Sequence, residues 1–481
     1  MVFTSFVYIA FLLGVLVLYF TVPARTQRIL LLVASYAFYA YWKPQYLLML
    51  LAITTIDYVA ARRIESTHTM GAKRLLLAAS IVANLGLLFT YKYYDFVAGQ
   101  WNTLSPWCGW EGRLPIFGLL IPLGISFHTF QSISYTVDVY RGTYRAERNY
   151  VNLALFISFF PQLVAGPIER ARQLLPQLTQ VNHFSLDACL SGAMLIAYGF
   201  FKKLVLADNL AVLVDQYFVP QGDATGGLSL IAVYAFALQI YFDFSGYTDI
   251  ARGSARMLGI TMIENFRAPY FSTSVREFWR RWHISLTDWF REFVYHPLLA
   301  QGVNRGICVV IVFALSGIWH GANWTFLAWG LLNACFYFMM ADYRPLPHLS
   351  KAIGTGAPWV TWAIAVARCI ISFHLICLTW VFFRAANIAE AMSVLRGIAG
   401  GASDIRTVLA RVVSDHPFRL AIIAGAIATD TCLTLLAPQY QWIESLTARK
   451  SWPYWLTMTL FVYITLFLGQ LGAEQFIYFQ F

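Results

Sequence analysis

Long apolar stretches separated by short polar connections recur along the whole chain. A helix needs about 20 apolar residues to cross the hydrocarbon core of a bilayer, and many of these stretches approach that length. Several are short or are interrupted by proline, as at Pro115 and Pro122. We therefore predict an all-α integral membrane protein with roughly eleven transmembrane helices plus re-entrant and interfacial helices. The apolar stretches lie near residues 6–22, 29–42, 46–61, 75–94, 116–137, 150–165, 188–206, 226–246, 306–320, 322–341, 358–383, 418–437 and 454–472.

Basic residues are concentrated on alternate connections in the first third of the chain. Arg25 and Arg28 follow the first apolar stretch, and a basic connection at 62–74 follows the third. Because basic connections stay on the cytosolic side, this pattern places the N-terminus outside and the 62–74 connection inside, as well as the basic connection at 141–148. Simple alternation fails at the two arginines of residues 170–172, where we expect a re-entrant segment. The pattern does not predict topology beyond that point.

The composition supports a membrane protein. Hydrophobic residues make up 59% of the 481 residues, aromatic residues 17% and charged residues only 12%, with a mean hydropathy of +0.60. These proportions are typical of a polytopic membrane protein. Residues 6–22 have neither a basic start nor a small-residue cleavage site, so we expect a retained span. The net charge of +10 is accounted for by cytosolic connections facing anionic lipid, and we expect no nucleic-acid partner.

The spacing of the cysteines and the absence of common catalytic motifs argue against several kinds of site. The seven cysteines are scattered, no pair has CxxC spacing, and their number is odd, so the sequence supports neither a disulfide framework nor a zinc site. The chain contains no GxSxG elbow, phosphate loop, GxGxxG or HExxH motif. We therefore expect no bound metal or cofactor.

The uncharged stretch at 306–341 contains a histidine. As one straight helix its 36 residues would span about 54 Å, well beyond the hydrocarbon core of about 30 Å. We expect it to break between Ser316-Gly317 and Gly321-Ala322-Asn323, which places His320 at membrane depth beside irregular backbone. An ionisable residue in that position is a functional candidate. An imidazole, with an ordinary pKa near 6.5, is suited to take a hydroxyl proton.

Residues 274–295 have the pattern of an amphipathic helix. Ser274 and Glu277 have the spacing of a capping box, and we expect Pro297 to end the helix. One face carries Phe278, Trp282, Leu286, Trp289 and Phe293. The other carries Arg276, Arg280, His283, Thr287 and Arg291.

Two compatible interpretations of this polar face are open. In the first, its arginines anchor an interfacial helix on lipid phosphates. In the second, they bind the phosphates of a thioester donor at the cytosolic mouth of a substrate cavity. Arg276 and Arg280 are the donor-binding candidates, and His283 is not explained by lipid anchoring. Elsewhere, Asp243 and Asp249 would be costly at membrane depth unless paired. We expect a structural ion pair with Arg252 or Arg256.

Several motifs resemble the membrane-bound O-acyltransferase family, in particular its bacterial branch that acetylates exopolysaccharides. The long central block is the most specific part, and the resemblance covers nearly the whole chain. The matching segments are 122–128, 160–161, 165–167, 241–249, 264–266, 269–270, 277–286, 319–321, 380–384 and 476–481.

The resemblance implies a single transmembrane domain over residues 1–481, with a catalytic core at about 115–385 and tilted helices around a central funnel that contains both histidines. It implies that His320 is the general base or proton relay and that His283 orients or polarises the acyl group. Asn323 adds a polar group to the donor site. The implied reaction takes a short acyl group, acetyl in this branch, from a cytosolic thioester such as acetyl-CoA. The acceptor is a hydroxyl of a secreted polysaccharide such as alginate or cellulose, at the bacterial inner membrane, with periplasmic acetylation proteins as partners.

Two other functions remain open at this point. The first is D-alanyl transfer from a carrier protein to teichoic acid, which would need an apolar and basic docking platform on the cytosolic surface. The second is a polysaccharide or lipid transporter without enzymatic activity. A transporter often shows internal symmetry, and the sequence shows none.

Overall fold

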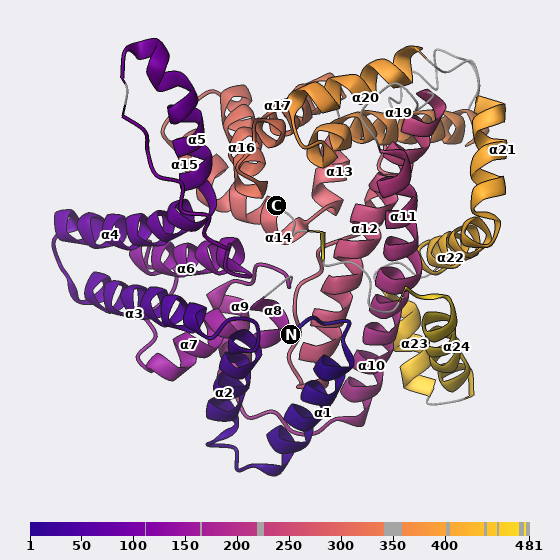
Figure 1. Ribbon diagram of the computed structural model, residues 1–481. Coiled ribbons are helices and arrows are strands. Elements are labelled where there is room, and N and C mark those ends of the chain that lie inside the picture. The colour runs from indigo at the N-terminus through magenta and orange to yellow at the C-terminus, as the bar shows by residue number, and fades with distance from the viewer. Residues whose placement is uncertain are drawn as a thin grey trace. The chain divides into compact units, whose positions relative to one another are not determined.

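The computed structural model describes most of the chain, and every described secondary-structure element is helical (Figure 1). This confirms the all-α prediction. Ala165 and residues 478–481, which belong to the motifs named above, lie outside the described residues. The described residues are 1–110, 112–163, 166–218, 226–340, 358–400, 405–436, 440–449, 452–470 and 476–477.

The helices form two compact units. The first unit comprises Met1–Phe200, Gly246–Ile263 and Ile443–Phe461. Its helices are α1 (Phe6–Thr21), α2 (Gln27–Ala40), α3 (Gln45–Ser66), α4 (Met70–Leu88), η1 (Phe89–Tyr93), α5 (Tyr94–Leu104), η2 (Ser105–Cys108), α6 (Ile125–Tyr140), α7 (Tyr150–Ser158), α8 (Phe160–Leu163), α9 (Ala171–Thr179) and α10 (Leu186–Phe200), with the C-terminal part of α12 (Gly226–Met257) and most of α23 (Gln441–Arg449) and α24 (Trp452–Leu468).

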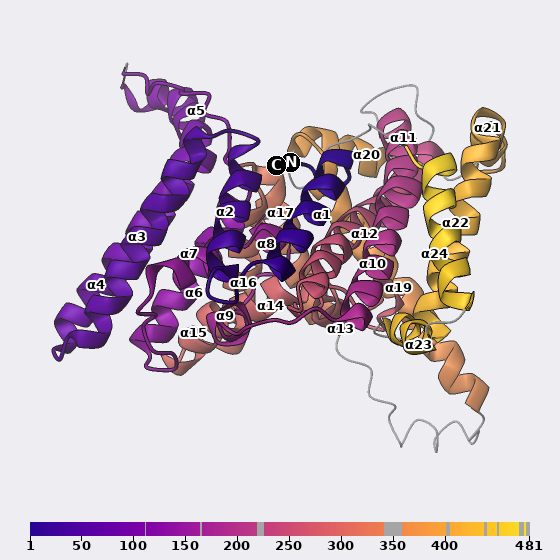
Figure 2. The same cartoon turned by 90° about the horizontal axis from the view of Figure 1, so that it is seen from below.

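Packing in the first unit relies on small and polar residues as well as apolar ones. Helices α3 and α4 lie side by side (Figures 1 and 2). Between them, the carboxylate of Asp57 accepts hydrogen bonds from Ser80 at 2.6 Å and Asn84 at 2.9 Å. Helix α10 crosses α12 at glycines, where a Cβ on Gly192 would lie 2.6 Å from the carbonyl oxygen of Gly253. Such small-residue crossings are typical of membrane helices.

The second unit comprises Phe201–Ser245, Glu264–Trp442 and Val462–Phe481. It contains both histidines that the sequence singles out. Its helices are η3 (Phe201–Ala207), α11 (Asp208–Tyr217), the N-terminal part of α12, η4 (Pro269–Phe271), α13 (Val275–Arg281), α14 (Ile284–Phe290), η5 (Arg291–Tyr295), α15 (His296–Ala300), α16 (Arg305–His320), α17 (Trp324–Met339), α19 (Pro358–Arg384), α20 (Ile388–Gly400), α21 (Ile405–Asp415) and α22 (Pro417–Leu436), with the remaining residues of α23 and α24.

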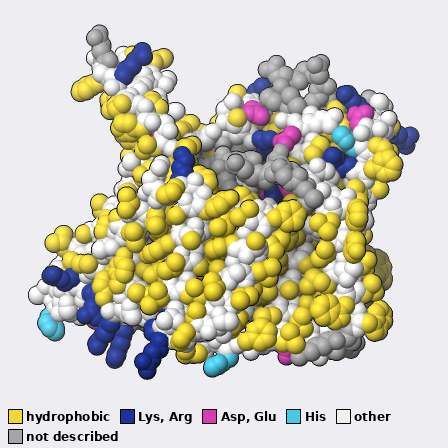
Figure 3. All heavy atoms as spheres, turned by 60° about the horizontal axis from the view of Figure 1, so that its bottom comes forward, with side chains coloured by type: hydrophobic (Ala, Val, Ile, Leu, Met, Phe, Trp, Pro, Cys, Tyr) yellow, Lys and Arg dark blue, Asp and Glu magenta, His cyan; other side chains and the backbone are white. Residues whose placement is uncertain are grey.

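Several helices are apolar enough to cross a membrane. Within the described residues, four helical segments have both the length and the hydropathy of a span, and five shorter helices are apolar. The four long segments are Met70–Cys108, Leu186–Tyr217, Gly226–Met257 and Trp359–Arg384. Figure 3 shows a face on which hydrophobic side chains predominate, with Lys and Arg gathered near its edge. A hydrophobic surface of this extent on a folded chain is expected where lipid is the solvent.

The predicted amphipathic helix at 274–295 is not continuous. The chain leaves the helical conformation at Trp282 and His283 between α13 and α14, and residues 291–295 form a wider π-helical turn. The predicted end at Pro297 is also wrong, because this proline lies in the first turn of α15, where it needs no backbone N–H. The break removes the continuous polar face that the spacing predicted.

Candidate active site

His320 is the last residue of α16, directly before the chain reverses into α17. The predicted break in the uncharged stretch is therefore present, at residues 321–323. Gly317 does not take part in it but lies where the two helices cross. A Cβ on Gly317 would lie 3.5 Å from the Cα of Gly330 and under 3.0 Å from the carbonyl oxygen of Phe326. The close crossing fixes the hairpin of α16 and α17, whose first helix ends at His320.

The residues of the break have identifiable structural roles. A Cβ on Gly321 would overlap the ring of Phe326, so the tight connection needs glycine there. Asn323 caps α17 by accepting a hydrogen bond from the backbone N–H of Thr325 at 3.1 Å. Its amide nitrogen donates to the carbonyl oxygen of Ala386 at 2.7 Å. Both ends of the Asn323 side chain therefore hold the protein's own backbone.

The ring of His320 is enclosed by aromatic side chains. It lies 4.9 Å from the ring centroid of Trp319, 5.0 Å from Trp329 and 5.1 Å from Phe383, each in an edge-on arrangement. Only 5% of the residue is exposed. This environment excludes water, which strengthens any hydrogen bond that the imidazole makes.

His283 lies in the break between α13 and α14 with a left-handed backbone, φ +42°. Helical periodicity placed it on the polar face of an amphipathic helix, whereas in the structure the residue is only 1% exposed. Asn265 holds the break: its carbonyl oxygen accepts from the N–H of Ile284 at 3.0 Å, and its side chain accepts from the N–H of Ser285 at 3.2 Å. Left-handed backbone is costly for a residue other than glycine, so it persists only where its surroundings impose it.

Trp319 lies between the two histidines. The His283 ring is 6.1 Å from the Trp319 ring, and the Trp319 ring is in turn 4.9 Å from His320. The His283 ring also lies 4.7 Å from the ring of Phe244, in an edge-on arrangement. The structure thus brings together two buried imidazoles that stand 37 positions apart in the sequence.

Burial decides the charge of His283. Removal from water lowers the pKa of His283 from its ordinary value near 6.5 to about 3. At neutral pH the imidazole is therefore uncharged, with one nitrogen able to donate a hydrogen bond and the other able to accept one.

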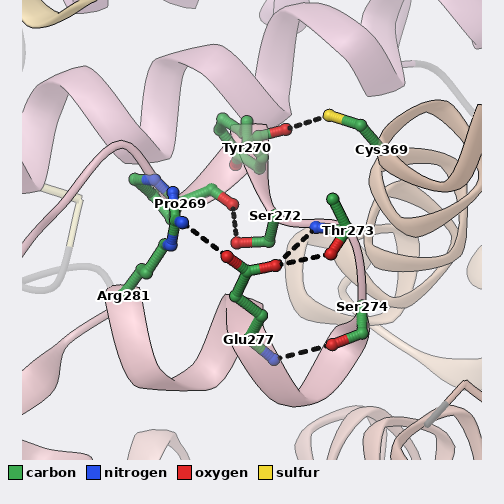
Figure 4. A network of polar contacts seen from close by, with 8 residues as sticks. All are labelled: Pro269, Tyr270, Ser272, Thr273, Ser274, Glu277, Arg281 and Cys369. Atoms are coloured by element: carbon green, nitrogen blue, oxygen red, sulfur yellow. Dashed lines mark hydrogen bonds and ion pairs between the residues drawn. The ribbon is translucent and has the colours of Figure 1, made fainter. Parts of the chain in front are cut away.

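A polar network fixes the start of α13 (Figure 4). The hydroxyl of Ser274 accepts from the N–H of Glu277 at 3.0 Å, as the predicted capping box requires. The Glu277 carboxylate reaches back to the N–H and the hydroxyl of Thr273, both at 2.8 Å, and also pairs with Arg281. These contacts set the direction of α13, and hence the position of the break that holds His283.

The two arginines proposed for donor binding differ in their surroundings. The Nε of Arg276 donates to the carbonyl oxygen of Tyr337 at 3.1 Å, and its guanidinium lies 4.9 Å from the Tyr337 ring. Arg280 is exposed in the last turn of α13. Of the two, Arg280 has the more accessible side chain for an external phosphate.

The two buried aspartates, Asp243 and Asp249, pair with different basic residues. Asp249 lies 3.5 Å from Arg252, the arginine proposed from the sequence. Asp243 pairs instead with Lys203 at 2.8 Å, so the sequence-based choice of an arginine for Asp243 was wrong. Lys203 is a buried residue that the sequence reasoning missed. Its only sequence signal was a charged group within the apolar stretch 188–206.

No group of three or more His, Cys, Asp or Glu side chains that could hold a metal ion occurs among the residues that the structure describes. His374, a histidine within the apolar helix α19, has ordinary structural contacts. Its ring nitrogens lie 2.8 Å from the hydroxyl of Tyr234 and 2.7 Å from the carbonyl oxygen of Ile370.

Comparison with known proteins identifies the family. The family model of membrane-bound O-acyltransferases matches residues 145–383. The probable alginate O-acetylase AlgI of Azotobacter vinelandii is 39% identical over 400 residues, covering 81% of this chain and 76% of the relative. The peptidoglycan O-acetyltransferase of Helicobacter pylori is 34% identical, covering 78% and 74%. The teichoic acid D-alanyltransferase of Bacillus subtilis is 26% identical, covering 64% and 77%. The chain therefore belongs to the membrane-bound O-acyltransferase family and is a membrane-embedded O-acyltransferase.

Proposed function

We propose that this enzyme moves an acetyl group from a cytosolic thioester, acetyl-CoA, towards hydroxyls of a polysaccharide outside the cytoplasm. The relatives that cover most of the chain are named for O-acetylation of alginate or peptidoglycan. Both of these acceptors are carbohydrate polymers with free hydroxyls. The acceptor proposed here is an exopolysaccharide such as alginate or cellulose.

The observation that carries the proposal is the pair of buried histidines whose rings both lie against Trp319. A thioester is already activated, so transfer to an alcohol needs alignment, a base and stabilisation of the developing oxyanion. In the proposed step His320 accepts the proton of the attacking hydroxyl as the new C–O bond forms. The C–S bond then breaks, and His320 returns the proton to the departing thiolate. Uncharged His283 donates a hydrogen bond to the acyl carbonyl oxygen and orients it.

We assign donor phosphate binding first to Arg280, whose side chain is exposed. Guanidinium groups match phosphate oxygens in geometry and charge. Arg276 is a weaker candidate because its side chain is less exposed than that of Arg280 and lies against Tyr337. Asn323 is engaged at both ends, so we propose that it supports the donor site through the backbone it holds. The alternative, that the arginines bind lipid headgroups, predicts unchanged donor affinity after charge reversal.

The cellular setting proposed from the sequence is a bacterial inner membrane with the N-terminus on the periplasmic side. Roughly eleven spans would be built from the apolar helices, grouped around a funnel that admits donor and acceptor from opposite sides. Periplasmic acetylation proteins are proposed as partners, so the hydroxyl that attacks the thioester belongs either to the polymer or to a partner that passes the acetyl group on to the polymer. D-alanyl transfer to teichoic acid is the rival chemistry, favoured only by the more distant D-alanyltransferase relatives.

The test is the ester content of polymers in a strain lacking this protein. Base-labile acetate and D-alanine are measured on polymer from wild-type, deletion and complemented cells. Loss of acetate that the wild-type protein restores supports the proposal. Loss of D-alanine with acetate retained would assign the rival reaction, and no change in either ester would reject both.

A further inference from the structure

A buried charge cluster includes one residue of α12, the helix whose Phe244 contacts His283. Lys203, in the π-helical turn η3, lies 2.7 Å from Asp208 and 2.8 Å from Asp243. All three side chains are at most 3% exposed. Two carboxylates and one ammonium lose much hydration free energy when they are buried. A protein in which apolar residues of similar volume replace such a group is often equally stable. The cluster therefore calls for a role beyond stability.

The second oxygen of Asp243 holds a segment near the C-terminus. Its Oδ2 accepts a hydrogen bond from the backbone N–H of Ile477 at 2.7 Å. The preceding residue, Phe476, is fully buried, and its ring lies 5.6 Å from the ring of Phe244. One carboxylate thus connects η3, α12 and residues 476–477.

Phe244 contacts both the C-terminal segment and His283. It directly follows Asp243 on α12 and has Phe476 on one side. Its ring meets His283 at 4.7 Å with an interplanar angle of 82°, and it also packs at 5.1 Å against Phe266, next to the Asn265 that holds the break. Edge-on aromatic contacts are directional, so movement of the Phe244 ring changes the position available to His283.

We propose that Asp243 and the Phe476–Ile477 segment are positioning elements that hold His283 in its reactive orientation through Phe244. This inference rests on the proposed function, because it requires His283 to act on the acyl group. The left-handed backbone at His283 persists only under external constraint. Asn265 holds the backbone on either side of the break, and the contact with Phe244, itself packed against Phe476, adds a constraint on the His283 ring.

A matched pair of substitutions isolates the hydrogen bond to Asp243. Ile477→Pro removes the backbone N–H, whereas Ile477→Ala removes more side-chain bulk but keeps that donor. A second pair acts on the acceptor: Asp243→Asn keeps an oxygen that can accept from Ile477, and Asp243→Ala does not. The positioning role predicts that Ile477→Pro and Asp243→Ala lower kcat by about ten-fold to a hundred-fold. Ile477→Ala and Asp243→Asn should retain most of the wild-type kcat. The apparent KM for acetyl-CoA should be unchanged in all four variants.

The decisive readout is a double-substitution test with His283→Ala. Transfer of radiolabelled acetyl from acetyl-CoA into base-labile ester is measured in membrane vesicles, normalised to enzyme abundance. If the segment acts through His283, Ile477→Pro should cause little further loss in the His283→Ala protein. An equal fold-loss in both backgrounds would show a general structural role and overturn the inference.

The same measurements distinguish failure of the proposed function from failure of the positioning role. If His283→Ala alone keeps the wild-type rate, His283 is not part of the chemistry, whatever Ile477→Pro does. If His283→Ala is impaired but Ile477→Pro and Asp243→Ala are not, the function stands and the positioning role is rejected. Should Ile477→Pro not accumulate in the membrane, Phe476→Ala tests the packing of the same segment against Phe244 with the same expected non-additivity.

Discussion

Substituting Gly317 by alanine tests whether the close crossing of α16 and α17 sets the position of His320. A Cβ at this position would lie under 3.0 Å from the carbonyl oxygen of Phe326. The two helices must therefore separate by about 1 Å, and overpacking of this kind costs about 1–3 kcal/mol. Replacing glycine by alanine inside a helix returns up to about 1 kcal/mol. We expect a net loss of stability of about 0–2 kcal/mol. A 1 Å displacement one turn before His320 should lower transfer by about a hundred-fold.

The matched control is Gly397→Ala in α20 of the same unit, where the new Cβ would have only an ordinary contact, 3.6 Å from the hydroxyl of Ser229. That variant should be at least as stable as wild type and fully active. The assays are thermal melting of detergent-purified protein and acetyl transfer in vesicles. If Gly317→Ala melts and transfers like wild type, the crossing does not position His320.

Three further predictions follow from the site and the predicted topology. Arg280→Glu should raise the apparent KM for acetyl-CoA several-fold more than it lowers kcat, and unchanged donor affinity would leave only lipid anchoring. Because burial lowers the pKa of His283 to about 3, its contribution to stability is complete above about pH 6.5 and is lost as pH falls towards 3. The melting temperature of wild type should therefore fall more steeply below about pH 6.5 than that of His283→Gln, and parallel curves would count against a neutral buried His283. A cysteine at Ser66, in the basic 62–74 connection of a variant whose seven native cysteines are replaced by serine, should escape an impermeant thiol reagent in intact spheroplasts and react after lysis. Labelling before lysis would reverse the proposed topology.

Features that depend on neighbouring residues were predictable from the sequence. The capping box at Ser274 and Glu277 needs only residues three positions apart, and it is present. The reversal within residues 306–341 follows from a length mismatch with the bilayer and from the glycine and asparagine at 321–323. The sequence did not distinguish the glycine that permits the turn, Gly321, from the one that permits the helix crossing, Gly317, because the crossing partner is on another helix.

Features that depend on distant segments were not predictable in this way. Helical periodicity placed His283 on a polar face, since nothing in residues 274–295 shows that Asn265 holds the chain open there. The partner of Asp243 is Lys203, which lies on another helix, while two nearby arginines looked suitable. In both cases a tertiary contact overrides the local pattern.

The central claim is that His320 carries the proton of the acceptor hydroxyl, and substitution by glutamine tests it most directly. Glutamine can replace a packing hydrogen bond, whose loss in a membrane protein costs only about 0.6 kcal/mol, but it cannot accept and return a proton. Polymer acetylation, protein abundance and melting temperature are measured together for His320→Gln and for His374→Gln, a histidine with structural contacts only. We predict that His320→Gln accumulates and melts normally but loses about 10²–10⁴-fold in transfer, while His374→Gln stays active. Near-normal acetylation by His320→Gln would contradict the assignment.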